Sequence, residues 1–128
     1  MSESNMNGVE DTLFIPLAAR ILASKKYPNF FYDQKSLQFD NLKQIKSINN
    51  KSSEYTMLAS VARYYVMDKI VKSFLSNNEN AIIVNLGVDL ETMNYRLKDY
   101  KGHFFQVDFP SVIKARERLL KKLITKLL

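Results

Sequence analysis

The run of apolar residues at positions 81–87 constrains the fold more than any other part of this sequence. The segment "AIIVNLG" places β-branched and aliphatic residues next to one another, without the polar alternation of a strand that has one face in water. It therefore predicts a strand at Ala81–Leu86 that is covered on both faces, as in a parallel sheet. Gly87 ends the run and leaves two alternatives, the turn of a nucleotide-type binding loop or the plain end of a buried strand.

A second strand and a helix follow, and together they predict the opening of a doubly wound α/β sheet. The segment "HFFQVD" at His103–Asp108 predicts the strand, separated from the first by about one helix length of sequence. Pro110 suits the first turn of the helix. The apolar residues of this helix are Val112, Leu119, Leu120, Leu123, Ile124, Leu127 and Leu128. Core packing is their expected role, and docking on a partner or an anionic membrane surface is the alternative.

The preceding residues 1–80 are predicted to form an N-terminal helical cap region, and residues 81–128 the first part of the α/β domain. "DTLFIPLAARILASKKY" predicts a helix that Pro16 either begins or bends. Tyr27–Phe39 suits an ordered turn on a core, and "SINNKSS" at 47–53 predicts a loop. Thr56–Leu75 gives the strongest helical pattern of this half. Its apolar residues near one face are Met57, Leu58, Val61, Ala62, Tyr65, Ile70, Val71, Phe74 and Leu75.

Composition excludes several classes of protein. The chain has 128 residues, enough for one small domain, no cysteine, and one histidine, His103, so disulfides and cysteine nucleophiles are excluded and no metal site is expected. The sequence offers no apolar stretch of roughly 20 residues for a membrane span, and Met1–Asp11 lacks the pattern of a signal peptide, so we expect a cytoplasmic protein. Of the net charge of +6, the last segment, Lys114–Leu128, carries +5. Nucleic-acid binding is therefore the least favoured function.

Four segments follow one another along nearly the whole chain: "DTLFIPLAARILASKK", "ARYYVMDKIVKSFL", "VNLGVDLETMNYRL" and "FFQVDFPSVIKARERLL". In this order they resemble the leucine carboxyl methyltransferase and polyketide O-methyltransferase-like family of S-adenosylmethionine-dependent enzymes. The resemblance implies a class I, Rossmann-like methyltransferase sheet with an added N-terminal helical region. It also implies that S-adenosylmethionine binds where the strand ends meet the helix starts.

The resemblance implies cofactor-binding residues at Arg63, Gly87, Asp89 and Asp108, and it identifies no catalytic residue. Gly87 would let the backbone approach the ligand. Asp108 would accept hydrogen bonds from the ribose hydroxyls, and Arg63 would pair with the carboxylate of the cofactor. The structural alternatives are a strand end for Gly87, a helix-capping acid for Asp108 and a solvated surface charge for Arg63.

The sequence also departs from the family pattern. The form G-x-G-x-D-T is here Gly87-Val88-Asp89-Leu90-Glu91-Thr92, so Asp89 adds a side chain and a negative charge where a second glycine is usual. Gln106 stands where the family often has an acid. Family members continue through further strands, and two parallel strands are a poor independent unit. We therefore expect an incomplete sheet, in a truncated product or in a fragment that needs partner surface.

Two functions remain favoured. The first is an O-methyltransferase that transfers a methyl group from S-adenosylmethionine to a carboxylate or hydroxyl of a small molecule or protein. The second is a non-catalytic, methyltransferase-derived interaction module, whose surface pairs with a second copy or with a partner chain that completes the sheet. Weak cofactor binding caused by Asp89 would favour the second function.

Overall fold

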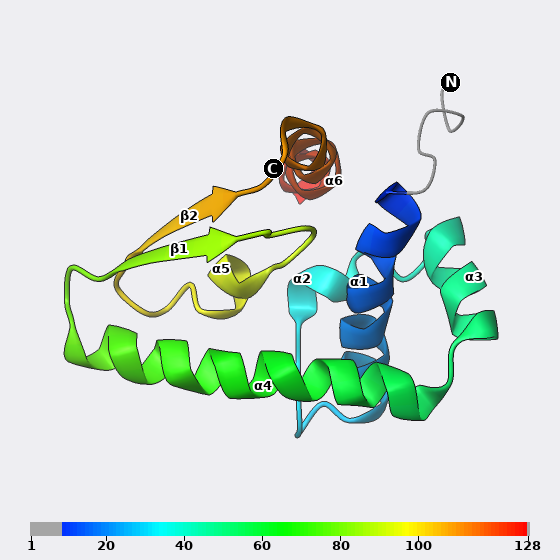
Figure 1. Cartoon of the computed structure of the whole chain (residues 1–128), viewed down its shortest axis with the longest axis horizontal. Helices are drawn as coiled ribbons and strands as arrows, with labels where there is room; N and C mark the ends of the chain where they lie inside the picture. The colour runs from blue at the N-terminus through cyan, green and yellow to red at the C-terminus, as the bar shows by residue number, and fades with distance from the viewer. Residues whose placement is uncertain (1–8, 128) are drawn as a thin grey trace.

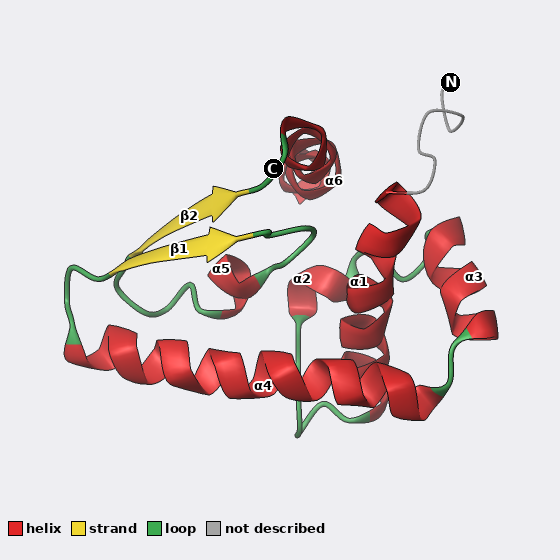
Figure 2. Ribbon diagram, in the orientation of Figure 1, coloured by secondary structure: helices red, strands yellow, loops and turns green. Residues whose placement is uncertain are grey.

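The computed structural model describes the backbone of residues 9–127 and the side chains of residues 12–120. Its architecture is the predicted one, a helical N-terminal region followed by a parallel α/β unit (Figures 1 and 2). The elements are α1 (Val9–Lys26), α2 (Gln34–Leu37), α3 (Lys43–Lys51), α4 (Glu54–Asn77), β1 (Ile82–Leu86), α5 (Met93–Arg96), β2 (His103–Val107) and α6 (Pro110–Leu127).

The two strands form a parallel sheet whose register pairs Ile82 with His103 and Leu86 with Val107. The parallel pairing confirms the prediction, although the crossover between the strands contains only the single turn α5. The prediction that the first strand is covered on both faces is wrong for the described residues. Its outer side chains, Ile82, Val84 and Leu86, are 61%, 54% and 73% exposed, because no described element lies over that face.

Helix α4 joins two hydrophobic clusters and runs beneath both halves of the molecule (Figure 1). Met57 and Val61 in its N-terminal half pack in the cluster of α1, whereas Val71 and Leu75 pack in the cluster that contains α5 and the inner face of the sheet. The helix was predicted, but three of the residues placed near one apolar face, Ala62, Ile70 and Phe74, are exposed. The sheet covers only the side of α4 that carries Val71 and Leu75.

Tertiary packing also decides the helices of the N-terminal region. Pro16 lies inside α1, so the alternative in which it begins the helix is wrong. Buried neighbours such as Phe14 and Leu17 hold the helix on both sides of the proline. The loop predicted at 47–53 is also wrong over residues 47–51, which belong to α3. This helix forms because Ile45 is fully buried against the core and Ile48 packs beside it.

Helix α6 begins at Pro110, as predicted, and packs on the core rather than standing free. Val112, Ala115 and Leu120 are buried, and Val112 and Leu120 join the cluster of α1. Core packing of this helix is therefore confirmed over its described side chains. The remaining residues predicted on the apolar stripe lie outside the described side chains: Leu123, Ile124, Leu127 and Leu128.

A close contact at Gly102 fixes the sheet on α4 and gives a stability prediction. A Cβ at this position would lie 2.6 Å from Leu75 Cδ2 and 3.3 Å from the Ala81 carbonyl oxygen. We expect Gly102→Ala to lower the free energy of unfolding by about 1–3 kcal/mol, because a buried leucine and a backbone atom must move. Urea denaturation of both proteins measures the difference. A variant as stable as the wild type would show that Leu75 and the backbone at Ala81 can move aside without loss of stability.

Candidate functional site

The loop that follows β1 has an unusual backbone, and it lies against the end of β2. The N–H groups of Gly87 and Val88 both donate to the carbonyl oxygen of Val107, at 2.8 and 3.3 Å. Gly87 has φ +60, in the left-handed region that favours glycine, and a Cβ added there would meet nothing within 4 Å. The chain therefore turns sharply at the end of β1 and leaves open space over Gly87.

The carboxylate of Asp108 closes this loop from the end of β2. Its Oδ2 accepts the N–H of Asp89 at 2.9 Å, and its Oδ1 accepts the N–H of Phe109 at 2.7 Å. The bond to Phe109, the residue before α6, supports part of the helix-capping alternative for Asp108. A carboxylate offers about four acceptor positions, so two local bonds leave capacity for a further ligand.

Asp89 also has a left-handed backbone, with φ 46, at the position where the family form has its second glycine. The loop therefore keeps a glycine-like turn although the residue has changed, since aspartate tolerates this region better than most residues. Burial raises the pKa of the Asp89 carboxyl, and the charge of Asp108 and a hydrogen bond to it raise that pKa further. Two carboxylates thus meet at the candidate site, and the charge of Asp108 opposes the ionisation of Asp89.

Arg116 holds the same loop from α6. Its Nη1 donates to the carbonyl oxygens of Asp89 and Glu91, at 2.9 and 2.7 Å, and the side chain is buried. Most of the net positive charge lies in Lys114–Leu128, but Arg116 is buried there and binds backbone carbonyl oxygens of the loop. It is a positioning residue for the loop.

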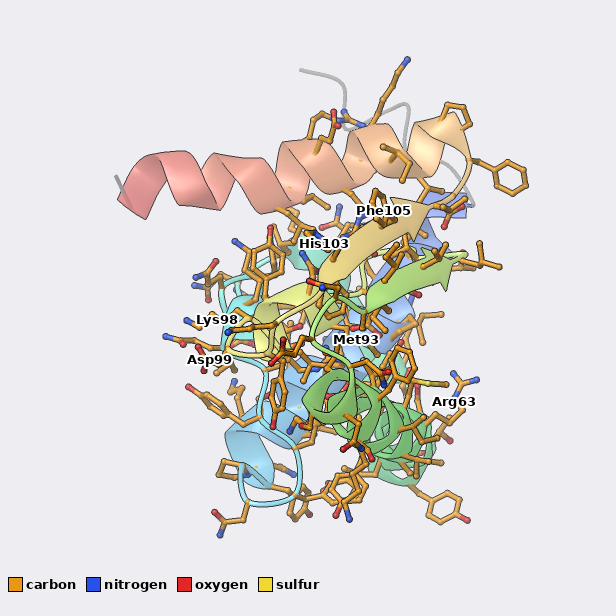
Figure 3. The ribbon with its side chains drawn as sticks, turned by 90° about the vertical axis from the view of Figure 1, so that its left-hand side faces the viewer. Arg63, Met93, Lys98, Asp99, His103 and Phe105 are labelled. Atoms are coloured by element: carbon orange, nitrogen blue, oxygen red, sulfur yellow. The ribbon has the colours of Figure 1, made fainter. Side chains whose placement is uncertain are left out.

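Arg63 lies apart from these groups. It is exposed on α4, and Figure 3 shows its side chain pointing outward from that helix. The structure thus brings Gly87, Asp89 and Asp108 together at the ends of the two strands. A role for Arg63 in binding the cofactor stays a prediction.

Beneath the loop, a buried network of charges joins the N-terminal helices to the α/β unit. Asp33, the N-cap of α2, has no exposed surface. Its Oδ2 is 3.3 Å from Nε of Arg20 in α1 and 2.9 Å from Nη1 of Arg96 in α5, and it accepts hydrogen bonds from Ser36 and Thr92. Burial opposes the ionisation of Asp33, but the two arginines and two hydroxyls outweigh it and lower its pKa.

Arg96 is the centre of this network. Its Nε and Nη2 bind both carboxylate oxygens of Asp68 in α4, at 2.8 and 2.9 Å, and its Nη1 lies 2.7 Å from Glu91 Oε1. Its guanidinium also lies over the ring of Phe31, 5.0 Å from the centroid. Burial acts to lower the pKa of Arg96, but the three acids raise it overall. Arg96 therefore links α5 to three other segments: the residues before α2, helix α4 and the loop that follows β1.

Sequence reasoning missed this network. The signal was present, because Arg20 lies within the apolar run "LAARILA" and Arg96 within "NYRL". A charge at a position where helical spacing predicts burial requires a partner. The sequence does not show which acids supply it.

The family comparison supports the resemblance. The family model of leucine carboxyl methyltransferase matches residues 5–127. This chain belongs to that family. Leucine carboxyl methyltransferases generally use S-adenosylmethionine as their methyl donor. No solved structure gives a significant match to the chain.

The strand-end loop fits part of what a leucine carboxyl methyltransferase needs to hold its cofactor. The open space over Gly87 admits close approach to the backbone, and Asp108 keeps free acceptor capacity for hydroxyl groups. Asp89 fits less well, because it adds a second carboxylate beside the first.

Neither a membrane-spanning helix nor a group of metal-ligating side chains occurs in the part of the chain that the structure describes. None of its helices combines the length and the apolar character that a membrane span requires. Nor do three or more histidine, aspartate or glutamate side chains gather there as metal ligands would.

Proposed function

We propose that this chain binds S-adenosylmethionine at the loop formed by Gly87, Asp89 and Asp108, as the cofactor half of an O-methyltransferase. The observation that carries the proposal is the left-handed turn at Gly87, with open space above it, beside the carboxylate of Asp108. Ligands of open α/β sheets bind at the carboxyl ends of the strands, where these residues lie. The bound cofactor would supply an electrophilic methyl group, and the acceptor would be a carboxylate or hydroxyl of a small molecule or protein.

The residues of this chain would position the cofactor rather than change its reactivity. Asp108 would accept the ribose hydroxyls on the acceptor positions left free by its two backbone bonds. Arg116 would keep the loop in place through the carbonyls of Asp89 and Glu91. Arg63, exposed on α4, would supply a guanidinium for the carboxylate of the cofactor. Methyl transfer of this kind depends chiefly on holding donor and acceptor in line.

A non-catalytic interaction module is the second candidate, and one observation favours it. The side chain of Asp89 and the resulting pair of carboxylates stand where the family form has a glycine. A chain with this change can keep the fold of its family and lose affinity for the cofactor.

Calorimetric titration with S-adenosylmethionine and S-adenosylhomocysteine tests the proposed function. We expect the wild type to bind both, and Asp108→Ala to weaken binding by about 10- to 100-fold, because it removes a charged hydrogen-bond acceptor. Asp99→Ala is the matched control, since Asp99 is exposed in the loop before β2 and on another side of the molecule (Figure 3).

The controls separate the two candidates. Circular dichroism of each variant shows whether it keeps the wild-type fold. Binding that Asp108→Ala leaves unchanged would place the cofactor elsewhere. A folded wild type that binds neither ligand would favour the interaction module.

A further inference from the structure

Three successive carbonyl groups of the loop after β1 are bound by two arginines from distant helices. Arg116 of α6 donates to the carbonyl oxygens of Asp89 and Glu91. Arg20 of α1 donates from Nη2 to the carbonyl oxygen between them, that of Leu90, at 2.7 Å. Figure 1 shows this loop extending from the sheet toward α1. The loop is therefore held from two sides, and one of the two arginines belongs to the N-terminal helical region.

Arg20 divides its donors between the loop and an ion pair. Its side chain is buried, and its Nε lies 3.3 Å from Asp33 Oδ2 and donates to Ser36 Oγ at 3.2 Å. The bond to Leu90 comes from a different nitrogen, Nη2. The guanidinium also lies over the ring of Tyr64 in α4, 5.0 Å from the centroid. Because the planar fork aims its donors in fixed directions, one side chain can hold both Asp33 and the loop.

The loop requires such support because its backbone is unfavourable at Asp89. A left-handed backbone costs free energy in a residue that has a Cβ, and Asp89 has φ 46. The peptide group between Leu90 and Glu91 follows directly. Its carbonyl oxygen accepts from Arg20, and its N–H donates to the Val88 carbonyl oxygen at 2.9 Å. Leu90 is buried, so its carbonyl oxygen would be costly to leave without a donor, and Arg20 therefore opposes relaxation of the turn.

We propose that Arg20 is a positioning residue for the cofactor loop, so that affinity for S-adenosylmethionine depends on the contact between α1 and Leu90. This role rests on the proposed function, in which Gly87, Asp89 and Asp108 hold the cofactor. Arg20 acts through the backbone, because the N–H of Asp89 donates to Asp108 Oδ2 at 2.9 Å and orients that carboxylate. When the turn relaxes, Asp108 loses this orientation, and a group that is not preorganised binds its ligand more weakly.

A simpler role for Arg20 is to neutralise Asp33 alone, and Arg20→Lys separates the two roles. Lysine keeps a positive charge beside Asp33, but its single ammonium lacks the planar fork that reaches both Asp33 and the loop. If neutralisation were the whole role, the lysine variant would keep the wild-type affinity. Under the proposed role, the variant keeps a positive charge near Asp33 and loses the bond to Leu90.

Calorimetric titration with S-adenosylmethionine of the wild type, Arg20→Lys and Ile45→Val tests the proposal. We expect Arg20→Lys to bind at least about tenfold more weakly, because it loses a charged hydrogen bond that orders the loop. Ile45→Val is the matched control. Ile45 is fully buried in the hydrophobic cluster of α1, and its replacement lowers stability without removing a donor to the loop. It should bind as tightly as the wild type, and circular dichroism verifies the fold of each protein.

Hydrogen exchange measures the order of the loop in the ligand-free proteins. The measured quantity is the exchange rate of the Glu91 amide divided by that of the His103 amide, which is hydrogen-bonded at the other end of the sheet. Arg20→Lys should raise this ratio at least about tenfold, and Ile45→Val should leave it unchanged. If Arg20→Lys does not fold, the ratio is compared between Asp89→Gly and the double variant Asp89→Gly/Arg20→Lys, because glycine stabilises the turn. The same rise is expected there.

The proposal is overturned if Arg20→Lys binds within about twofold of the wild type, or if Ile45→Val loses as much affinity. An unchanged exchange ratio also overturns it, because Arg20 would then act through Asp33 alone. A wild type that does not bind S-adenosylmethionine contradicts the proposed function instead. The exchange ratio then decides by itself whether Arg20 positions the loop.

Discussion

Replacing Arg96 by methionine is expected to lower the free energy of unfolding by about 3–5 kcal/mol, the range observed when one partner of a buried ion pair is removed. The substitution leaves Asp33, Asp68 and Glu91 close together without their shared cation. Methionine fills much of the arginine volume, so the loss of charge and hydrogen bonds dominates. A small domain has only about 5–15 kcal/mol of stability, so this loss is a large fraction of the total.

Urea denaturation of wild type and variant measures this effect, and Lys98→Met is the matched control. Lys98 is exposed two residues away, so its replacement should change stability by about 0.5 kcal/mol or less. If Arg96→Met lowers the free energy of unfolding by less than about 1 kcal/mol, water or Arg20 compensates the negative charge of the three acids.

The pH dependence of the free energy of unfolding of wild type and Arg96→Met gives a second test. The lowered pKa of Asp33 stabilises the wild type above the ordinary aspartate pKa of about 3.9, and this contribution is lost as pH falls through the lower value in the folded state. In Arg96→Met, Asp33 loses one of the two arginines that lower its pKa, so it takes up a proton at a higher pH than in the wild type. The stability difference should therefore narrow below about pH 4. A difference that stays constant from pH 7 to pH 3 would contradict this electrostatic account.

Replacing Asp89 by glycine is expected to tighten the binding of S-adenosylmethionine by at least about tenfold, because one fewer carboxylate must be accommodated beside Asp108. The backbone already has φ 46, which glycine adopts without the cost that a side chain brings. The same change should raise the free energy of unfolding by about 1 kcal/mol.

Asp89→Asn separates the effect of the negative charge from the effect of the backbone conformation. Asparagine removes the negative charge but keeps a Cβ and tolerates the left-handed region. Asp89→Asn should therefore show the part of the affinity gain that comes from removing the charge. It should show little of the stability gain that comes from the backbone conformation. Calorimetric titration of the three proteins measures affinity. Equal or weaker binding by Asp89→Gly would show that Asp89 is not the obstacle.

The stability gain from removing Asp89 should also depend on pH. The pKa of Asp89 is raised in the folded state, so its ionised form costs stability above that pKa and costs none below the ordinary value of about 3.9. The increase in the free energy of unfolding caused by Asp89→Gly should thus be larger at pH 7 than at pH 3. The part that remains at pH 3 measures the contribution of the backbone conformation.

The sequence by itself determined the order of the elements in the α/β unit and the residues at the ends of its strands. The run at Ala81–Leu86 identified the first strand, Pro110 the start of α6, and Gly87 a sharp turn. These features are local, because strand-forming side chains, a fixed φ or a missing Cβ act within a few residues. Asp89 and Asp108 were expected at the strand ends because parallel strands finish at the same edge of a sheet.

Only the tertiary structure decided which distant residues meet and which faces are covered. Periodicity assigned Ile70 to a buried face, but the sheet covers a different side of α4, and the outer face of β1 has no cover among the described elements. Nothing local pairs Arg96 with Asp33, 63 residues away, or with Asp68, 28 residues away. A buried charge needs a partner, but chain folding brings that partner from any part of the sequence, so its identity is fixed only by packing in three dimensions.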